Sequence, residues 1–258
     1  MPKEKKLEQP TKSKISLMVA TPCYDTVQLH YCKSILDLQK ECILNGYQVT
    51  FQILKSSLVT QGRNLAASAF ITSNCTHFLF IDSDISFNTR SIFRLLHSPY
   101  ELSCIPYPMK TVNQNKFRKD LKERPDDDID SMGLTFPIHV KDPNNIKLKD
   151  SWIELHRAPT GCMMMQRSVF TKLIKEYPKL TIKQDHVIDG KMVRRPNFYN
   201  FFDTYYNQDD ETYLGEDFYF CKLWTDIGGK IHGLVDEKLI HTGEKSYTGS
   251  LRDELTAV

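Results

Sequence analysis

Residues 77–84 read H-F-L-F-I-D-S-D, an apolar run that stops abruptly at two acids. The run 78–81 is typical of a central strand that is buried on both faces of a parallel sheet. Asp82 and Asp84 follow it directly, so they are expected at the carboxyl edge of the sheet, where open α/β sheets bind ligands. Two acids this close raise each other's pKa unless a cation or a hydrogen-bond donor intervenes.

Hard carboxylate oxygens suit Mg²⁺ or Mn²⁺. The stretch therefore predicts a divalent metal site that also receives a phosphorylated ligand. The alternative interpretation is a polar turn in which Asp82 caps a helix that starts near Asn88, since D-x-D is a common tripeptide.

Strand-like and helix-like segments alternate around this stretch. The sequence predicts strands at 15–20, 49–53 and 102–105, and helices at 28–45, 62–70 and 88–96. Pro22 cannot donate to a strand ladder and is expected to end the first strand in a loop. The alternation predicts an α/β fold with a mostly parallel central sheet flanked by helices.

The second half of the chain is less regular. Residues 111–130 are charged and predict either a functional loop or a disordered, solvated segment. Further predictions are a hairpin within 136–155, a buried strand at 161–166, helices at 168–177 and 215–226, and a strand at 230–235. Residues 181–207 are basic and then aromatic, which predicts a lid or an acceptor surface.

Composition narrows the class of protein. The chain has 258 residues, 34 basic and 32 acidic side chains and a net charge of +2, so no global field attracts it to nucleic acid or membranes. Seven scattered cysteines without a C-x-x-C pair fit reduced cytosolic thiols. We expect a cytoplasmic protein with no membrane span, with one domain at 15–245, a disordered polar tail at 1–14 and a carboxyl-terminal tail at 246–258.

Six short motifs carry a family resemblance through their order and spacing. They are the strand and loop T-P-C-Y-D at 21–25, R-N at 63–64, D-S-D at 82–84, T-G at 160–161, E-D at 216–217 and a histidine at 241. With these motifs the chain resembles nucleotide-sugar glycosyltransferases of the GT-A fold. It is most similar to the inverting family-2 type and looks like the small soluble members that large DNA viruses carry.

The resemblance covers roughly residues 15–245, and each motif alone is short. It implies a Rossmann-like GT-A domain with a nucleotide-binding half at 15–110 and an acceptor-binding half, with a smaller hairpin and loops, at 111–245. The implied reaction moves a sugar from a nucleoside-diphosphate sugar, with UDP as the expected nucleotide, to a hydroxyl of a glycan or glycoprotein.

A departing diphosphate needs a cation to neutralise its charge. The resemblance implies that Asp84 ligates Mn²⁺ (or Mg²⁺) directly and that Asp82 binds ribose hydroxyls or a metal-bound water. His241 would complete the ligand set, although a lone histidine is usually a satisfied surface or core residue. Inversion requires a base opposite the leaving group. The resemblance implies Asp217 for this role, with Glu216 binding acceptor hydroxyls; acids are also favoured in any first helical turn.

Nucleotide capture is expected at the first strand-to-helix loop, from Thr21, Pro22, Tyr24 and Asp25. Tyr24 would stack on the base, and Asp25 would accept from a ring N–H. Arg63 would reach the base or the diphosphate as a bidentate donor, although an ordinary surface arginine is the alternative. The remaining candidate binding residues are Asn64, Ser83, Thr160, Gly161 and Lys245. Trp152 is expected either to stack on a sugar ring or to lie in the core.

Three other functions compete with this interpretation. Sugar nucleotidylyltransferases normally open with a glycine-rich loop and a basic residue, whereas residues 21–25 contain neither. A non-catalytic carbohydrate- or nucleotide-binding module is expected to lose the acids that this chain retains. Single-stranded nucleic-acid binding through residues 194–202 would use stacked aromatics, but the near-zero net charge disfavours it.

Overall fold

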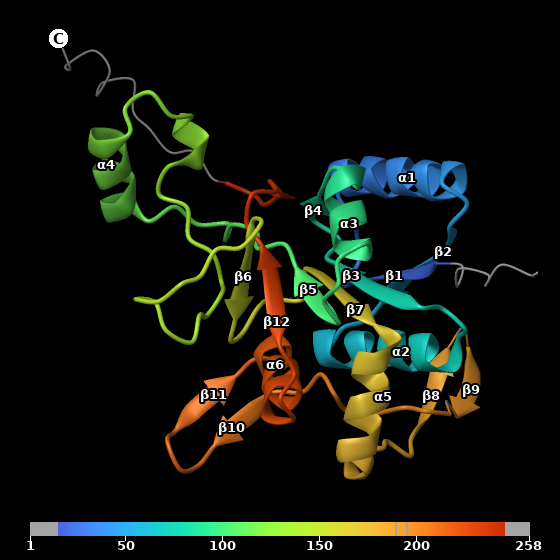
Figure 1. The fold of residues 1–258 in the computed structure, drawn as a ribbon. Helices are drawn as coiled ribbons and strands as arrows, with labels where there is room; N and C mark the ends of the chain where they lie inside the picture. Colours follow the sequence, from blue (N-terminus) through green and yellow to red (C-terminus); the bar gives the residue numbers. More distant parts are fainter. Residues whose placement is uncertain (1–14, 189, 195, 246–258) are drawn as a thin grey trace, which may run out of the picture.

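The computed structural model describes residues 15–188, 190–194 and 196–245 (Figure 1). The predicted tails at 1–14 and 246–258 lie outside the described residues, as does Arg195 of the basic segment.

A seven-stranded sheet of order β2-β1-β3-β7-β5-β12-β6 forms the centre of the molecule. Its strands are β1 (Ser16–Cys23), β2 (Gln48–Lys55), β3 (His77–Ile81), β5 (Leu102–Cys104), β6 (Trp152–Leu155), β7 (Cys162–Gln166) and β12 (Ile231–Leu234). Strands β1, β2, β3, β5 and β12 run in one direction, and β6 and β7 run in the other. The predicted α/β class with a mixed, mostly parallel sheet is confirmed.

Helices cover both faces of this sheet (Figure 1). One face carries α1 (Leu29–Leu44) and α3 (Thr89–Leu96), and the other carries α2 (Val59–Thr72), α5 (Arg167–Glu176) and α6 (Glu216–Asp226). Alternate residues of β3 enter the two layers, with Phe78 and Phe80 on one side and Leu79 and Ile81 on the other. Each of these four side chains is fully buried, which is worth roughly 1.5–3 kcal/mol apiece. The predicted strand at 77–81 is thereby anchored, and the acids after it are held at a fixed edge.

Three short strand pairs lie outside the central sheet. They are β4 (Ile85–Ser86) with β13 (Ile240–His241), β8 (Asp185–Ile188) with β9 (Lys191–Arg194), and β10 (Tyr205–Asn207) with β11 (Thr212–Leu214). The β4–β13 pair matters most for the site, because it sets His241 opposite Ile85, one residue beyond Asp84.

Strand β1 continues through Pro22, so the prediction that this proline ends the strand in a loop is wrong. The Cys23 carbonyl accepts from Ser56 N on the side of β2. Because the backbone polar groups of successive strand residues face alternate sides, the backbone nitrogen of Pro22 faces the side of β3. Pairing with β3 on that side has already ended at Ala20. The missing N–H of Pro22 therefore breaks no ladder bond.

The charged segment 111–130 is not a structureless loop. It contains α4 (Gln114–Glu123) and a 3₁₀ turn at Ile129–Ser131. Asn113 caps α4 by accepting from Lys116 N, and the nearly buried Asp120 accepts from Gly133 N. These two hydrogen bonds hold the segment in a defined structure, which the pattern of apolar residues does not predict. Helix α4 lies well away from the central sheet (Figure 1).

Two further predictions for the second half of the chain are confirmed only in part. Residues 136–155 contain a tight hairpin turn, in which Lys149 and Trp152 exchange backbone hydrogen bonds, but the strand β6 that follows pairs with β12, some eighty residues on. The aromatics Phe198, Phe201 and Phe202 are buried in the core and form no base-stacking groove, so the predicted lid or acceptor surface would have to use exposed residues of the segment such as Tyr206. Among the described residues, no helix combines the length and apolar character needed to cross a membrane.

Candidate functional site

The predicted ligand edge of the sheet carries a cavity of about 290 Å³. It opens where β1, β2 and β3 end, and its lining includes Pro22, Tyr24, Ser56, Arg63, Asp82, Ser83, Asp84 and His241. Parallel strands bring their carboxyl ends to one edge, and that is why residues from four separate segments meet here. The sequence-predicted motifs at 22–24, 63, 82–84 and 241 therefore converge.

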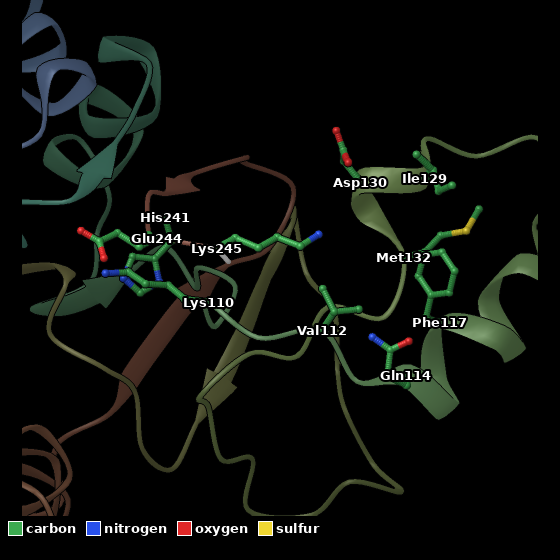
Figure 2. A pocket seen from close by; sticks show the side chains of 11 residues that line it. Lys110, Val112, Gln114, Phe117, Ile129, Asp130, Met132, His241, Glu244 and Lys245 are labelled. Carbon is green, nitrogen blue, oxygen red and sulfur yellow. The ribbon is translucent and has the colours of Figure 1, made fainter. Parts of the chain in front are cut away.

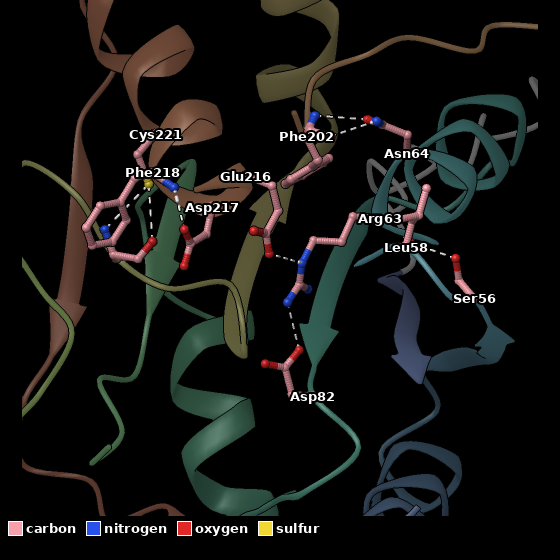
Figure 3. A network of polar contacts seen from close by, with 11 residues as sticks. Ser56, Leu58, Arg63, Asn64, Asp82, Phe202, Glu216, Asp217, Phe218 and Cys221 are labelled. Atoms are coloured by element: carbon pink, nitrogen blue, oxygen red, sulfur yellow. Dashed lines mark hydrogen bonds and ion pairs between the residues drawn. The ribbon is translucent and has the colours of Figure 1, made fainter. Parts of the chain in front are cut away.

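Arg63 lies at the centre of the site (Figure 3). It is 4% exposed, and it donates from Nη2 to Asp82 Oδ1 at 2.9 Å and from Nε to Glu216 Oε1 at 3.2 Å. Burial disfavours the charged form of the Arg63 guanidinium group, but the carboxylates of Asp82 and Glu216 outweigh that effect and raise the pKa of Arg63. Its Nη1 is buried and has no hydrogen-bond partner among the described residues. Arg63 thus joins the end of β3 to the start of α6 and keeps one donor available for a ligand.

Asp82 does not cap the helix that follows. Asn88 caps α3 by accepting from Arg90 N, whereas the Asp82 carboxylate accepts from Arg63. The capping part of the alternative is therefore wrong, but residues 82–85 do form a turn, in which Ile85 N donates to the Asp82 carbonyl at 3.1 Å.

Asp84 is held by residues from two other segments. Lys110 donates from Nζ to Asp84 Oδ2 at 2.5 Å, and His241 Nε2 lies 3.4 Å from Asp84 Oδ1. Burial alone would raise the pKa of Asp84, but these two partners lower it to about 2. The carboxylate is therefore ionised throughout the physiological range.

Asp84 and His241 bring a carboxylate oxygen and an imidazole nitrogen together at the cavity. His241 Nδ1 lies 2.8 Å from the carbonyl of Pro108; because a carbonyl only accepts, Nδ1 carries a proton, and Nε2 is the ring nitrogen that faces Asp84. Carboxylate oxygen with imidazole nitrogen suits Mn²⁺, and water and phosphate oxygens commonly complete such sites. No cluster of three or more potential histidine, cysteine or acidic ligands occurs in the described part of the chain.

Asp217 is the second acid with a perturbed environment. It lies in the first turn of α6, next to Glu216 (Figure 3), and accepts from Phe218 N at 2.7 Å. Burial and the charge of Glu216 raise its pKa from the usual 3.8 to about 6. A carboxyl group tuned to this range can take up a proton near neutral pH.

Gly161 allows two side chains of the site to approach. A Cβ at this position would lie 2.5 Å from Tyr107 Oη and 2.7 Å from Asp82 Oδ2. The Gly161 carbonyl also accepts from Asp82 N at 3.0 Å. The predicted T-G motif is thus packed directly against the D-S-D motif.

Replacing Gly161 by alanine is therefore expected to displace Asp82 or Tyr107 and to weaken ligand binding at this edge at least roughly tenfold, since overpacking typically costs 1–3 kcal/mol. Titration of nucleoside diphosphates by calorimetry would measure the effect. Gly233→Ala, where the nearest atom is a leucine methyl group in the sheet, is the matched control. Unchanged affinity in Gly161→Ala would contradict this packing role.

Two predicted binding residues have core partners instead. The Thr21 hydroxyl is buried in β1 and accepts from Tyr31 Oη at 2.6 Å. Asn64 donates from Nδ2 to the Phe202 carbonyl and to Asn200, and its Oδ1 accepts from Phe202 N. Asn64 therefore supports the 200–202 segment from inside the core and does not line the cavity (Figure 3).

The other predicted residues are scattered around the site. Tyr24 is 75% exposed at the cavity rim, and the Asp25 carboxylate is paired with Lys55. Thr160 is buried, with no hydrogen-bond partner for its hydroxyl among the described residues. Trp152 is partly buried at the edge of the core, packs edge-to-face on Tyr100 and is absent from the cavity lining.

A second cavity, of about 650 Å³, adjoins the site (Figure 2). His241 and Lys110 form its inner end, Lys245 lines it, and the segment around α4 forms its far side. The sequence did not indicate that Lys110, Tyr107 or the residues around α4 would lie at the site. The one available signal was that residues 106–110 follow the strand β5 and so leave the same edge of the sheet.

No protein-family model matches the chain, and no curated protein matches it. The solved structures similar to it include A197 from STIV (15% identity, 89% of this chain and 86% of that chain, TM-score 0.47), a glycosyltransferase involved in the glycosylation of the major capsid of PBCV-1 (12%, 65% and 70%, TM-score 0.30), and the inositol-1-phosphate CTP transferase from T. maritima (8%, 94% and 94%, TM-score 0.40). These similarities are too weak to indicate an activity, so the function has to be inferred from the site itself.

Proposed function

We propose that this protein is an inverting glycosyltransferase that moves a sugar from a nucleoside-diphosphate sugar, with UDP as the nucleotide, to a hydroxyl group of a glycan or glycoprotein. The observation that carries the proposal is the opposite tuning of two acids, one in the cavity and one at the start of α6, whose neighbours Asp82 and Glu216 are joined by Arg63. Asp84 has its pKa lowered to about 2, whereas Asp217 has its pKa raised to about 6. Environments that push the pKa values of neighbouring acids apart identify an acid that remains charged and an acid that exchanges a proton.

Asp84 and His241 would hold Mn²⁺ or Mg²⁺. When bound there, such a cation would neutralise the negative charge that develops on the leaving diphosphate. Asp82 is proposed to bind the ribose, oriented by its ion pair with Arg63. The free Nη1 of Arg63 is a donor suited to a diphosphate or base oxygen.

Asp217 is proposed to remove the proton from the acceptor hydroxyl. Its carboxylate is oriented by the Phe218 amide, and its raised pKa gives it more basicity than an exposed aspartate has. Glu216, fixed by Arg63, would bind neighbouring hydroxyls of the acceptor. Because Arg63 contacts both Asp82 and Glu216, the donor and acceptor sides of the site share one rigid connection.

Turnover is expected to depend on pH through Asp217. The base works only when it is ionised, so kcat/KM should increase about tenfold per pH unit below about 6 and level off above it. Initial rates between pH 4.5 and 8 would measure this profile. A profile that stays flat between pH 5 and 7 would contradict the assignment of Asp217.

The function itself is tested in two stages. A thermal-shift screen of nucleoside diphosphates and nucleotide sugars, with and without Mn²⁺, identifies the donor, because a ligand that binds the native state stabilises it by mass action. Release of the nucleoside diphosphate with each stabilising donor then separates a transferase from a binding module. Stabilisation by nucleoside triphosphates and sugar phosphates, with release of pyrophosphate, would point to a nucleotidylyltransferase and overturn the proposal.

A further inference from the structure

Lys110 takes part in the site in a way that the proposed reaction does not use. It follows β5 and reaches across to Asp84, with Nζ 2.5 Å from Oδ2. Its stem lies against the backbone after His241, since a Cβ on Gly243 would be 2.6 Å from Lys110 Cδ. The lysine is therefore held between the ends of β5 and β13, with its ammonium group on Asp84.

The chemistry around Asp84 calls for a positive charge. His241 Nδ1 lies 2.8 Å from the Pro108 carbonyl, and Nε2 faces Asp84 Oδ1 at 3.4 Å. The Asp84 side chain is only 27% exposed, and a partly buried carboxylate is unfavourable without a nearby cation. The Lys110 ammonium group supplies that cation in the structure described here.

We propose that the Lys110 ammonium group is a resident counter-ion of Asp84 that a divalent cation has to displace, so that Lys110 sets the affinity of the site for the metal. This inference rests on the metal site in the proposed function. Both cations need the same carboxylate, and two positive charges a few ångströms apart oppose each other. The Asp84 carboxylate therefore binds either the Lys110 ammonium group or the metal, but not both at once.

The surroundings of Lys110 make this exchange feasible. The Lys110 side chain is 37% exposed and that of Asp84 is 27% exposed. Lys110 also lines the second cavity, of about 650 Å³, beside His241 (Figure 2). An ammonium group released from Asp84 can turn into this open space without losing its hydration, so displacement does not bury an unpaired charge.

Binding of Mn²⁺ to the whole protein, without nucleotide, tests the inference. Electron paramagnetic resonance of free Mn²⁺ gives the dissociation constant directly. Lys110→Met is expected to bind Mn²⁺ roughly three- to tenfold more tightly than the native protein, because it removes a competing ion pair of moderate strength. Lys33→Met is the matched control, since Lys33 forms an exposed pair with Asp37 on α1, and it should leave the affinity unchanged.

A second variant and a second measurement keep the test independent of folding. Lys110→Gln should also bind Mn²⁺ more tightly, and saturating Mn²⁺ should raise the melting temperature of both Lys110 variants more than that of the native protein. Asp84→Asn should remove the effect in each background. Mn²⁺ binding to the native protein with equal or weaker binding to both Lys110 variants would overturn the inference alone. No Mn²⁺ binding to any of these proteins would overturn it together with the metal site of the proposed function.

Discussion

Asp217→Asn is expected to lower kcat by roughly 10²–10⁴, the usual contribution of a positioned general base, while the affinity for the donor stays unchanged. Asparagine keeps the size of the side chain and can still accept from Phe218 N, but it cannot take up the proton of the acceptor hydroxyl. Turnover and donor titration on the same preparation would measure both quantities. Asp226→Asn, at the other end of α6 and paired with Lys222, is the matched control.

The same substitution has an expected effect on stability. Because the folded state raises the pKa of Asp217 from 3.8 to about 6, the stabilising contribution of the protonated form is fully present below pH 3.8 and is lost as the pH rises through about 6. Asp217→Asn carries no charge at any pH. Its free energy of unfolding at pH 8 should therefore exceed that of the native protein, by something on the order of 1–3 kcal/mol. A variant that is inactive and also less stable would show a structural rather than a catalytic role.

Asp84→Ala is expected to abolish the dependence of donor binding on Mn²⁺. A cation at a leaving diphosphate supplies several kcal/mol of charge stabilisation, so turnover should fall by roughly 10²-fold or more. Calorimetric titration of the nucleoside diphosphate with and without Mn²⁺ is the decisive measurement. Asp37→Ala, which removes an equally charged partner of a lysine on α1, should leave the metal dependence intact. Donor binding by Asp84→Ala that still responds to Mn²⁺ would place the metal elsewhere.

Much of the central sheet could be predicted because its signals are local. The run 78–81 is apolar throughout since β3 is buried on both faces, and the helices α1 and α2 show their own periodicity or composition. The direction of β7 could not be predicted, because its place between β3 and β5 is decided by tertiary packing rather than by its own residues. Helix α4 was missed for a related reason: its order depends on Asp120 and Gly133, thirteen residues apart, rather than on an apolar stripe.

Site residues that directly follow a strand could be predicted from the sequence. Contacts between residues far apart in the chain could not. Asp82 and Asp84 come directly after β3, so their position at the edge of the sheet could be predicted from the sequence. Arg63, by contrast, contacts an acid 153 residues away, and no local pattern indicates that ion pair. The neighbouring residue Asn64 shares its motif but points into the core, so short motifs predict a location more reliably than a role.

Strand β7 has a consequence for how the polypeptide can be divided. It lies between β3 and β5 and pairs with both, so a strand from the later part of the sequence is inserted into the sheet of the earlier part. A fragment ending near residue 110 would leave one edge of β3 and both edges of β5 unpaired and would have no reason to fold on its own. Two fragments divided near residue 110 and expressed separately would have to assemble with β7 inserted between β3 and β5. The two parts of the chain are therefore halves of one folding unit rather than independent modules.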